Sequence, residues 1–411
     1  MLIFIYVGCT LFNASNKKYN EYNIYAVNGT LPTLIVGLDL VENNETPGFL
    51  WYAREGTFDK NVITKYMPNL VLSKNIGSYS SLHTILSAEM KEYVENILKE
   101  DPNAHFNLIV DEYRNWLEFP VLLELGLKDD QYSVRYYSDG TLSYVTEYDL
   151  LKENSYNLFE KEKENYYSII QATREGKNKC DPKCMYLINE ELDTPKGLMD
   201  YSYDANYVLL ATLRDNVEYY LQYPNLLEFK DDKIKDKMKN SYIKKLVVKE
   251  KFDNLSDEKK NMFFEIVSLD KKTFDANYFN SEGNKYLVIT GANPFYGNII
   301  PSKYYGIIDE IVSKYGNEYK ILYKPHPSAI PEGDIRSILN SKGIDILPGK
   351  MPMEAITFVY DDLKLGGFPS SLYMNVEAEN TLFFFSDSKE TLVSPLNKLY
   401  DKLFINAEIM S

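Results

Sequence analysis

Two short segments in the last third of the chain carry residue types that can bind a phosphate group and act on it. In the first, Lys324 and a proline precede His326, and Pro327 follows it. In the second, Ser370 and Ser371 come directly after the sequence Gly-Gly-Phe-Pro. Hydroxyl and free backbone N–H groups at a helix start bind anions, and an imidazole beside them can protonate a leaving group. The two segments together predict a phosphate site with an acid next to it.

Both segments follow residues with the pattern of strands. The apolar run 319–323 predicts a buried strand, and the prolines around His326 stop helix and sheet pairing, so the imidazole should lie in a loop beyond that strand. Residues 364–367 predict a second strand that leads into a short helix at 369–375. Because open α/β sheets bind ligands at the carboxyl edge of their strands, the two segments should meet there. Taken singly, each segment is also typical of an ordinary loop or helix cap.

The other two histidines lack such a context. His83 falls in an amphipathic helix pattern and His105 at the start of an expected strand. Packing or solvation is the simpler role for both, which leaves His326 as the candidate for chemistry.

Other expected strands of this half end in loops that suit a nucleotide. Gly291 follows the strand at 287–290 and permits a close approach of the backbone, and Phe295 in the same loop can stack on a base. Glu354 lies in the first turn of a helix after the strand at 344–347. Its carboxylate can accept two ribose hydroxyls, or simply complement the helix dipole. Successive loops therefore predict a nucleotide site.

Acidic residues in the first half follow strands in the same way. Asp111 and Glu112 come after the strand expected at 106–110, and Asp139 follows the strand expected at 132–137. An Asp-Gly pair is common in purely structural turns. In the functional interpretation, Asp139 projects into a cleft and Asp111 helps to bind an acceptor.

Length and charge limit the classes to which the chain can belong. Its 411 residues exceed what one core usually supports, which predicts two domains of about 200 residues each. With 60 acidic and 45 basic side chains, the net charge of -15 disfavours nucleic acid as the main partner. The 36 tyrosines suit clefts that stack on sugars or bases, although a codon bias would also produce them.

The cysteines number three and form no disulfide framework. Cys180 and Cys184 can pair or lie free on a turn, and no zinc ligands accompany them. Cys9 follows an apolar run that is too short to span a bilayer. Residues 1–20 are therefore open to two interpretations: a buried first strand, or a signal segment that ends at a lipidated Cys9.

Alternating strand and helix patterns predict two α/β units with parallel sheets. Residues 207–213 have a strand-like pattern, and the lysine-rich residues 231–251 predict a solvated connecting helix. A capped helix follows at 256–267. The second unit adds a strand at 381–385, helices at 301–315, 334–341 and 353–359, and a helix at 395–404 that crosses back to the first unit.

The order of three motifs resembles the bacterial sialyltransferases of glycosyltransferase family 80. That family has an acidic-Asp-Gly motif, a His-Pro motif and a Ser-Ser motif, which correspond here to Ser138-Asp139-Gly140, His326-Pro327 and Ser370-Ser371. The likeness extends over nearly the whole chain beyond about residue 20. Each motif alone is weak evidence for this resemblance, whereas the order of the three motifs and the sequence around them are specific.

The resemblance implies an α/β chain of the GT-B class, in which two Rossmann-like, doubly wound domains face each other across a cleft. The corresponding divisions are an extra or signal segment at 1–20, an acceptor-side domain with its connector at 21–250, a CMP-donor domain at 251–392 and a returning C-terminal helix at 393–411.

The resemblance also implies an activity: transfer of sialic acid (Neu5Ac) from CMP-sialic acid to a terminal galactoside, with inversion and without a metal. Asp139 would be the general base and would also contact the acceptor, and His326 would protonate or stabilise the leaving phosphate. Glu354 would hold the ribose, Ser370 and Ser371 the phosphate. Other donor-side positions would be Gly291, Lys324, Pro327 and Phe295, the last in the place of a family tryptophan.

Two departures from the family pattern concern the acceptor. Ser138 replaces the first acidic residue of its motif, and Asp111 stands where the family has an asparagine. We therefore expect a galactose-terminated oligosaccharide or lipooligosaccharide that differs from lactose-type sugars, with either an α2,3 or an α2,6 linkage. Because the family includes lipoproteins, the expected location is cytoplasmic or at the inner membrane, with membrane association through Cys9.

Two alternatives remain at this stage. A GT-B transferase that uses another CMP-activated acidic sugar, such as Kdo, would have a similar nucleotide half. A surface lipoprotein that binds sialylated glycans without turnover would need no nucleotide site.

Overall fold

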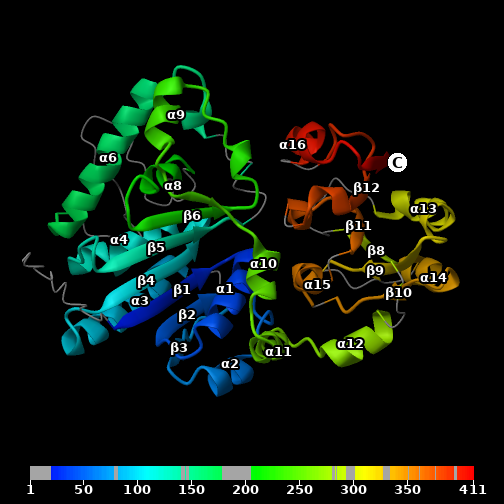
Figure 1. Ribbon diagram of the computed structural model, residues 1–411, viewed down its shortest axis with the longest axis horizontal. Helices are drawn as coiled ribbons and strands as arrows, with labels where there is room; N and C mark the ends of the chain where they lie inside the picture. Colours follow the sequence, from blue (N-terminus) through cyan, green and yellow to red (C-terminus); the bar gives the residue numbers. More distant parts are fainter. Residues whose placement is uncertain are drawn as a thin grey trace, which may run out of the picture.

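The computed structural model describes residues 20–77, 82–139, 144, 148–177, 205–279, 283, 285–292, 301–326, 334–349, 351–360, 362–374, 376–392 and 396–411. Figure 1 shows two sheets side by side, the first in blue to green and the second in yellow to red, each with helices packed around it. All strand pairings of both sheets are parallel.

The first sheet has seven strands in the order β3-β2-β1-β4-β5-β6-β7. They are β1 (Glu21–Val27), β2 (Gly48–Tyr52), β3 (Leu70–Leu72), β4 (His105–Asp111), β5 (Tyr132–Tyr137), β6 (Val217–Leu221) and β7 (Ile243–Lys245). The α-helices of this half are α1 (Thr30–Glu42), α2 (Lys60–Tyr66), α3 (Leu82–Glu100), α4 (Glu118–Val121), α6 (Tyr156–Arg174), α8 (Ala205–Ala211) and α9 (Asp232–Met238). Short 3-10 turns are η1 (Glu112–Leu117), η2 (Leu123–Leu125), η3 (Asp149–Leu151) and η4 (Pro224–Leu226).

The second sheet has six strands in the order β10-β9-β8-β11-β12-β13. They are β8 (Lys285–Thr290), β9 (Tyr319–Lys324), β10 (Asp345–Ile346), β11 (Lys364–Gly367), β12 (Thr381–Phe385) and β13 (Glu408–Met410). Its α-helices are α13 (Ile308–Tyr315), α14 (Asp334–Ser341), α15 (Met353–Val359) and α16 (Leu396–Leu403), with 3-10 turns η5 (Pro301–Ile307), η6 (Ser371–Met374) and η7 (Ala378–Asn380).

Three helices connect the sheets: α10 (Val248–Asp253), α11 (Asp257–Ile266) and α12 (Lys271–Tyr278). The Ser256 side chain caps α11 by accepting a hydrogen bond from the Lys259 N–H at 3.3 Å. Lys251 of α10 forms an ion pair with the buried Asp39 of α1 at 2.5 Å. The connector is thus fixed to the first domain by packing and by charge.

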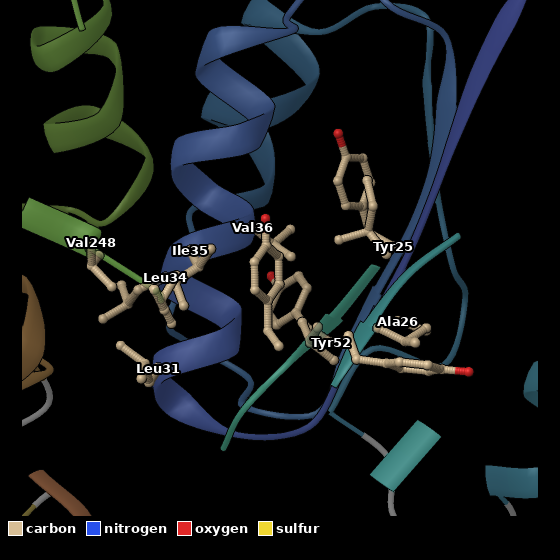
Figure 2. Close-up of a cluster of buried hydrophobic side chains, with 14 of the residues drawn as sticks. Tyr25, Ala26, Leu31, Leu34, Ile35, Val36, Tyr52 and Val248 are labelled. Atoms are coloured by element: carbon tan, nitrogen blue, oxygen red, sulfur yellow. The ribbon is translucent and has the colours of Figure 1, made fainter. Parts of the chain in front are cut away.

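Helix α1 is the centre of this packing. All of its residues from 31 to 41 are buried, since one side faces the sheet and the other faces the connector. Figure 2 shows Leu31 and Leu34 near Val248 of α10, with Val36 on the side of Tyr52. Burial on both sides explains why a helix without an amphipathic pattern is stable here.

The strands expected between 287 and 385 all form, as do the helices at 334–341 and 353–359, with the ends displaced by a few residues at most, whereas the helix expected at 301–315 begins as the 3-10 turn η5 and the one expected at 369–375 is only the 3-10 turn η6. Two expectations in other regions were wrong. Residues 207–213 lie mainly in helix α8, because a short, continuous apolar run fits a buried helix as well as a strand. Residues 231–251 contain α9, β7 and α10 instead of one helix. After α16 the chain adds β13, which pairs with β12 at the edge of the second sheet. None of the helices in the ranges given above is both long and apolar enough to span a bilayer.

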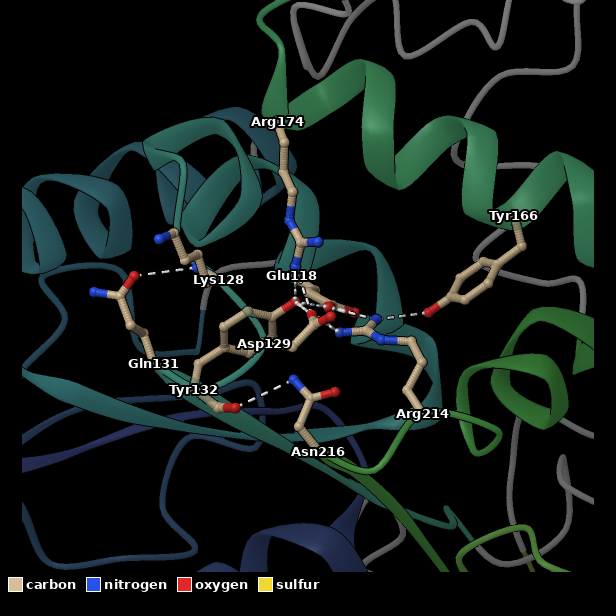
Figure 3. A network of polar contacts seen from close by, with 9 residues as sticks. All are labelled: Glu118, Lys128, Asp129, Gln131, Tyr132, Tyr166, Arg174, Arg214 and Asn216. Atoms are coloured by element: carbon tan, nitrogen blue, oxygen red, sulfur yellow. Dashed lines mark hydrogen bonds and ion pairs between the residues drawn. The ribbon is translucent and has the colours of Figure 1, made fainter.

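A buried ion pair joins helix α4 to the amino end of the first sheet. Arg214 contacts Glu118 at 2.7 Å, and both side chains are almost fully buried. The Tyr132 hydroxyl donates a hydrogen bond to the same carboxylate at 2.7 Å. Figure 3 shows how Asp129 and Arg174 extend this network.

We predict that Glu118→Ala lowers the free energy of unfolding by about 3 kcal/mol or more, because it removes the buried carboxylate from the buried Arg214 guanidinium and leaves it only the exposed Asp129 at 3.3 Å. Urea unfolding measures this change. The matched control is Glu265→Ala, which removes a half-exposed carboxylate that pairs with Lys65 and should cost less than about 1 kcal/mol. Equal losses in the two variants would contradict the buried-pair argument.

Candidate active site

The expected site residues lie at the carboxyl edges of both sheets. In the first sheet, the chain leaves β1 toward β2 on one side and returns in β4 on the other, so β1 and β4 flank a switch point. In the second sheet, β8 and β11 do the same. Ligands of open α/β sheets bind in the crevice at such points.

Acidic side chains lie together at the first switch point. Asp111 ends β4, is fully buried, and accepts a hydrogen bond from the backbone N–H of Asn28 in the turn after β1. Asp139 lies two residues beyond β5. A Cβ atom at Gly29, the residue before α1, would overlap the Asp139 carboxyl group. The carboxyl group can therefore occupy this place only because Gly29 has no side chain.

The Asp139 carboxyl group is made more basic by its surroundings. Its pKa is raised well above the ordinary value, first by burial and then by the negative charges of Asp111 and Glu112. The residue as a whole is half-buried, while its carboxyl group packs against Gly29. A carboxylate of raised pKa in such a place is a suitable proton acceptor.

Lys324 holds together two loops of the second domain. Its buried Nζ donates hydrogen bonds to the carbonyl oxygens of Pro325 at 2.8 Å and Gly349 at 2.9 Å. Burial lowers the pKa of Lys324 to about 8, while the carboxylate of Glu354 opposes that shift. These contacts give Lys324 a structural role in positioning the loop that carries His326.

His326 follows this lysine on the same loop. Gly291 packs against the loop, since a Cβ atom there would lie 3.1 Å from the backbone nitrogen of His326 and 2.7 Å from the Tyr323 hydroxyl. The pKa of His326 is lowered by burial, then by the positive charges of Lys324 and Arg54. The imidazole is thus favoured in its neutral form in the free protein.

Glu354 lies in the first turn of α15 and is 9% exposed. Burial raises its pKa, while hydrogen bonding to its own backbone N–H and the charges of Lys324 and Arg54 favour the carboxylate. Its expected contact with a ribose stays a prediction.

The serine pair lies after β11 on a tightly packed turn. Gly367 has φ 125° and its Cα lies so close to Thr290 that no side chain would fit. Ser370 is half-buried, and Ser371 begins η6. The helix expected at 369–375 is only this 3-10 turn, so the backbone here offers less anion-binding capacity than a full helix start would.

Arg54 is the functional candidate that the sequence analysis missed. It is exposed in the loop after β2, and its charge lowers the pKa of Asp139 on one side of the cleft and of His326 on the other. Because Glu354 in turn raises the pKa of Asp139, the two carboxyl edges face each other. Within the described ranges Arg54 has no ion pair with a protein carboxylate, which leaves it available for a ligand. Its only sequence signal was its place after an apolar strand.

Several expected features lie outside the described residues: Phe295, Pro327, Gly140, Cys9, Cys180 and Cys184, together with the side chain of Ser371. Their predicted roles stay predictions. No group of three His, Cys, Asp or Glu side chains is arranged as a metal site in the part of the chain that the structure covers.

We predict that Arg54→Gln raises the pKa of His326, because it removes one of the two positive charges that lower it. NMR titration can follow this change, since the chain has three histidines and a His326→Gln variant assigns the signal. Lys65→Gln, which removes an exposed charge paired with Glu265, should leave the titration unchanged. An unchanged His326 pKa in Arg54→Gln would show that the charge of Arg54 does not act on His326.

Comparison with protein-family models and with curated proteins found no match. Solved structures do match. An α/β-galactoside α-2,3-sialyltransferase from the luminous marine bacterium Photobacterium phosphoreum has 16% identity and a TM-score of 0.69, over 95% of this chain and 99% of that one. The GT-B domain of a sialyltransferase from Photobacterium damselae has 19% identity and a TM-score of 0.67, over 95% of this chain and all of that one.

A third match is a 2,6-sialyltransferase from a Photobacterium species of the Vibrionaceae, solved with the donor product CMP and the acceptor substrate lactose. It has 18% identity and a TM-score of 0.63, over 95% of this chain and 78% of that one. With the two sheets described above, these likenesses show that the chain has the GT-B fold, with two Rossmann-like domains.

Proposed function

We propose that the chain is an inverting, metal-independent sialyltransferase that moves sialic acid from CMP-sialic acid to a terminal galactoside. The observation that carries this proposal is that Asp139 and His326 follow the carboxyl ends of β5 and β9 in the two sheets, with Arg54 near enough to both for its charge to lower the pKa of each. The scaffold supports it, because the matching sialyltransferases cover 95% of the chain. In one of them the bound molecules are CMP and lactose.

The proposed step forms one bond and breaks another at the anomeric carbon of sialic acid. The galactose hydroxyl attacks this carbon while Asp139 takes the hydroxyl proton. The bond to the CMP phosphate oxygen breaks on the opposite face, and the electron pair leaves with the phosphate. His326 stabilises or protonates that oxygen. A base on one face and a leaving-group stabiliser on the other are what inversion through an oxocarbenium-like transition state requires.

Residues of both domains would bind the donor. In the second domain, Glu354 accepts the ribose hydroxyls and Ser370 donates to the phosphate from the turn after β11. In the first domain, Arg54 supplies a positive charge for the carboxylate of sialic acid. Asp111 borders the acceptor side beside Asp139.

We predict that the chain transfers sialic acid from CMP-sialic acid to labelled galactosides in the presence of EDTA. Asp139→Asn should lower kcat by about 10²- to 10⁴-fold, because it removes the proton acceptor, and should leave CMP binding nearly intact. His326→Ala should lower kcat with CMP-sialic acid through loss of leaving-group stabilisation. Product analysis and calorimetric titration with CMP measure these effects.

The matched control is Asp130→Asn, an exposed aspartate just before β5 and so at the opposite end of that strand from Asp139, which should keep full activity. Full activity of Asp139→Asn would exclude it as the base, and loss of transfer in EDTA would exclude the metal-independent mechanism. Transfer from CMP-Kdo in preference to CMP-sialic acid would show that the donor is CMP-Kdo. CMP that neither binds nor is released would favour a glycan-binding protein without turnover.

A second prediction concerns Gly29. Gly29→Ala should lower kcat by about 10²-fold, because the new methyl group displaces the Asp139 carboxyl group from its position. Gly306→Ala is the control, since nothing lies within 4 Å of a Cβ atom there. Both variants should bind CMP as the native protein does. Equal activity of the two variants would contradict the steric argument.

A further inference from the structure

A tyrosine joins the two domains near the carboxyl edges of their sheets. Tyr223 lies two residues beyond β6 in the first domain. Its hydroxyl donates a hydrogen bond to the backbone carbonyl of Val376 in the second domain at 2.9 Å. Its backbone N–H donates another hydrogen bond to the Tyr144 hydroxyl, also at 2.9 Å. Tyr223 thus forms a bridge between a segment of each domain.

The second-domain end of this bridge follows the serine pair. Val376 comes five residues after Ser371, with which η6 begins, and Ser370 directly precedes that turn. The Tyr373 hydroxyl of η6 lies 2.8 Å from the Thr290 hydroxyl at the end of β8. Because Tyr373 is also fully buried, η6 is fixed to the edge of the second sheet. The carbonyl that accepts the Tyr223 hydrogen bond therefore lies two residues beyond a turn that the sheet anchors.

The first-domain end of the bridge lies beside the acidic side chains. Tyr144 is five residues after Asp139 in the sequence. Burial is the main cause of the raised pKa of both groups, and the negative charge of Glu112 adds to it in each. Both are therefore within electrostatic reach of the same carboxylate. The rings of Tyr144 and Tyr223 also meet edge to face, with their centroids 6.4 Å apart, which orients the two residues toward each other.

The domains are not closely packed around this bridge. A cavity of about 450 Å³ lies beside it, between the connector and the second domain. Tyr223 and Val376 both line the cavity, together with Val248 of α10 and Phe358 of α15. Since a cavity takes the place of packing that would otherwise hold the surfaces together, the hydrogen bond is a larger part of what sets their separation here.

The Tyr223 hydroxyl keeps its proton from acidic to moderately alkaline pH. Burial raises the pKa of Tyr223, and the negative charges of Glu377 and Glu379 add to this shift. A protonated hydroxyl can donate to a carbonyl oxygen, whereas a phenolate cannot. The hydrogen bond to Val376 is therefore present throughout that range.

We propose that Tyr223 is a positioning residue that fixes the separation between the proposed base, Asp139, and the proposed phosphate site at the serine pair. The inference rests on the proposed transferase function, in which Asp139 acts on the acceptor while the serine pair binds the phosphate of the donor. Because these groups come from different domains, the distance between them depends on contacts that cross from one sheet to the other. A bridge between the two segments holds the reacting groups in the geometry that the transfer needs.

The first test is Tyr223→Phe, which removes the hydroxyl and keeps the ring and the backbone N–H. We expect kcat for transfer to fall about tenfold, while the Kd for CMP and the KM for CMP-sialic acid stay within about twofold. Tyr144→Phe breaks the other hydrogen bond of the bridge and should cause a similar loss of kcat. The double variant should lose no more than either single variant, because both substitutions interrupt the same connection.

Two control variants match these changes. Tyr242→Phe removes a hydroxyl that donates to Asp215 at 3.3 Å, just before β7 and so at the opposite end of the first sheet's strands. Lys402→Gln breaks an exposed contact with Glu228 at 3.5 Å and involves neither hydrogen bond of Tyr223. Both controls should keep the native kcat.

Hydrogen exchange measured by mass spectrometry gives a readout that does not depend on turnover. In the native protein, CMP should slow exchange of the peptide that contains Tyr223 by about fivefold or more, because CMP at the serine pair stabilises the segment whose carbonyl Tyr223 binds. Tyr223→Phe should lose this protection with its Kd for CMP unchanged.

The outcomes separate the positioning role from the proposed function. A native kcat in Tyr223→Phe, or losses in the two single variants that add in the double variant, would overturn the positioning role and leave the transferase intact. A loss of CMP affinity in parallel with kcat would also overturn it, since Tyr223 would then only support the structure. Protection by CMP that depends on Tyr223, in a native protein that transfers no sialic acid, would overturn the proposed function and support the coupling of the two segments.

Discussion

The contact between the Asp139 carboxyl group and the backbone of Gly29 is the constraint on which the arrangement of acidic groups at the first sheet's carboxyl edge depends. A turn without a side chain lets the carboxyl group lie against the start of α1, beside Asp111 and Glu112. The three acidic groups are thereby forced together, and the repulsion between them makes Asp139 a better proton acceptor. Packing of α1 between the sheet and the connector keeps this turn in place, so the chemistry at the edge depends on a helix buried on both sides.

The second domain uses charge of the opposite sign. Lys324 is buried to hold the carbonyl groups of two loops, and its positive charge, together with that of Arg54, acts on His326. Glu354 lies near both cations, and its carboxylate partly compensates their positive charge. Acidic groups of both domains thus act on Asp139, while a cation from each domain, Arg54 and Lys324, acts on His326.

The fold was largely predictable from sequence where one local signal sufficed. The apolar runs at 319–323 and 381–385 are long enough to specify buried strands, and the prolines around His326 require a loop. The strand predicted at residues 207–213 was wrong, because a continuous apolar run lacks the hydrophobic periodicity that distinguishes a buried helix from a buried strand. Arg54 and Gly29 could not be predicted, since their importance comes from partners far away in the sequence that only the two sheets bring close.

The state of His326 implies an order in the proposed reaction. In the free protein, burial and two cations favour the neutral imidazole, which has a single N–H donor and is a far weaker acid than the imidazolium. A bound phosphate brings negative charge to the same place and favours the imidazolium. By linkage, protonation of His326 and binding of the donor strengthen each other. The acid is therefore formed by the substrate on which it acts, and the acceptor's proton moves to Asp139 only in a cleft that already holds the donor.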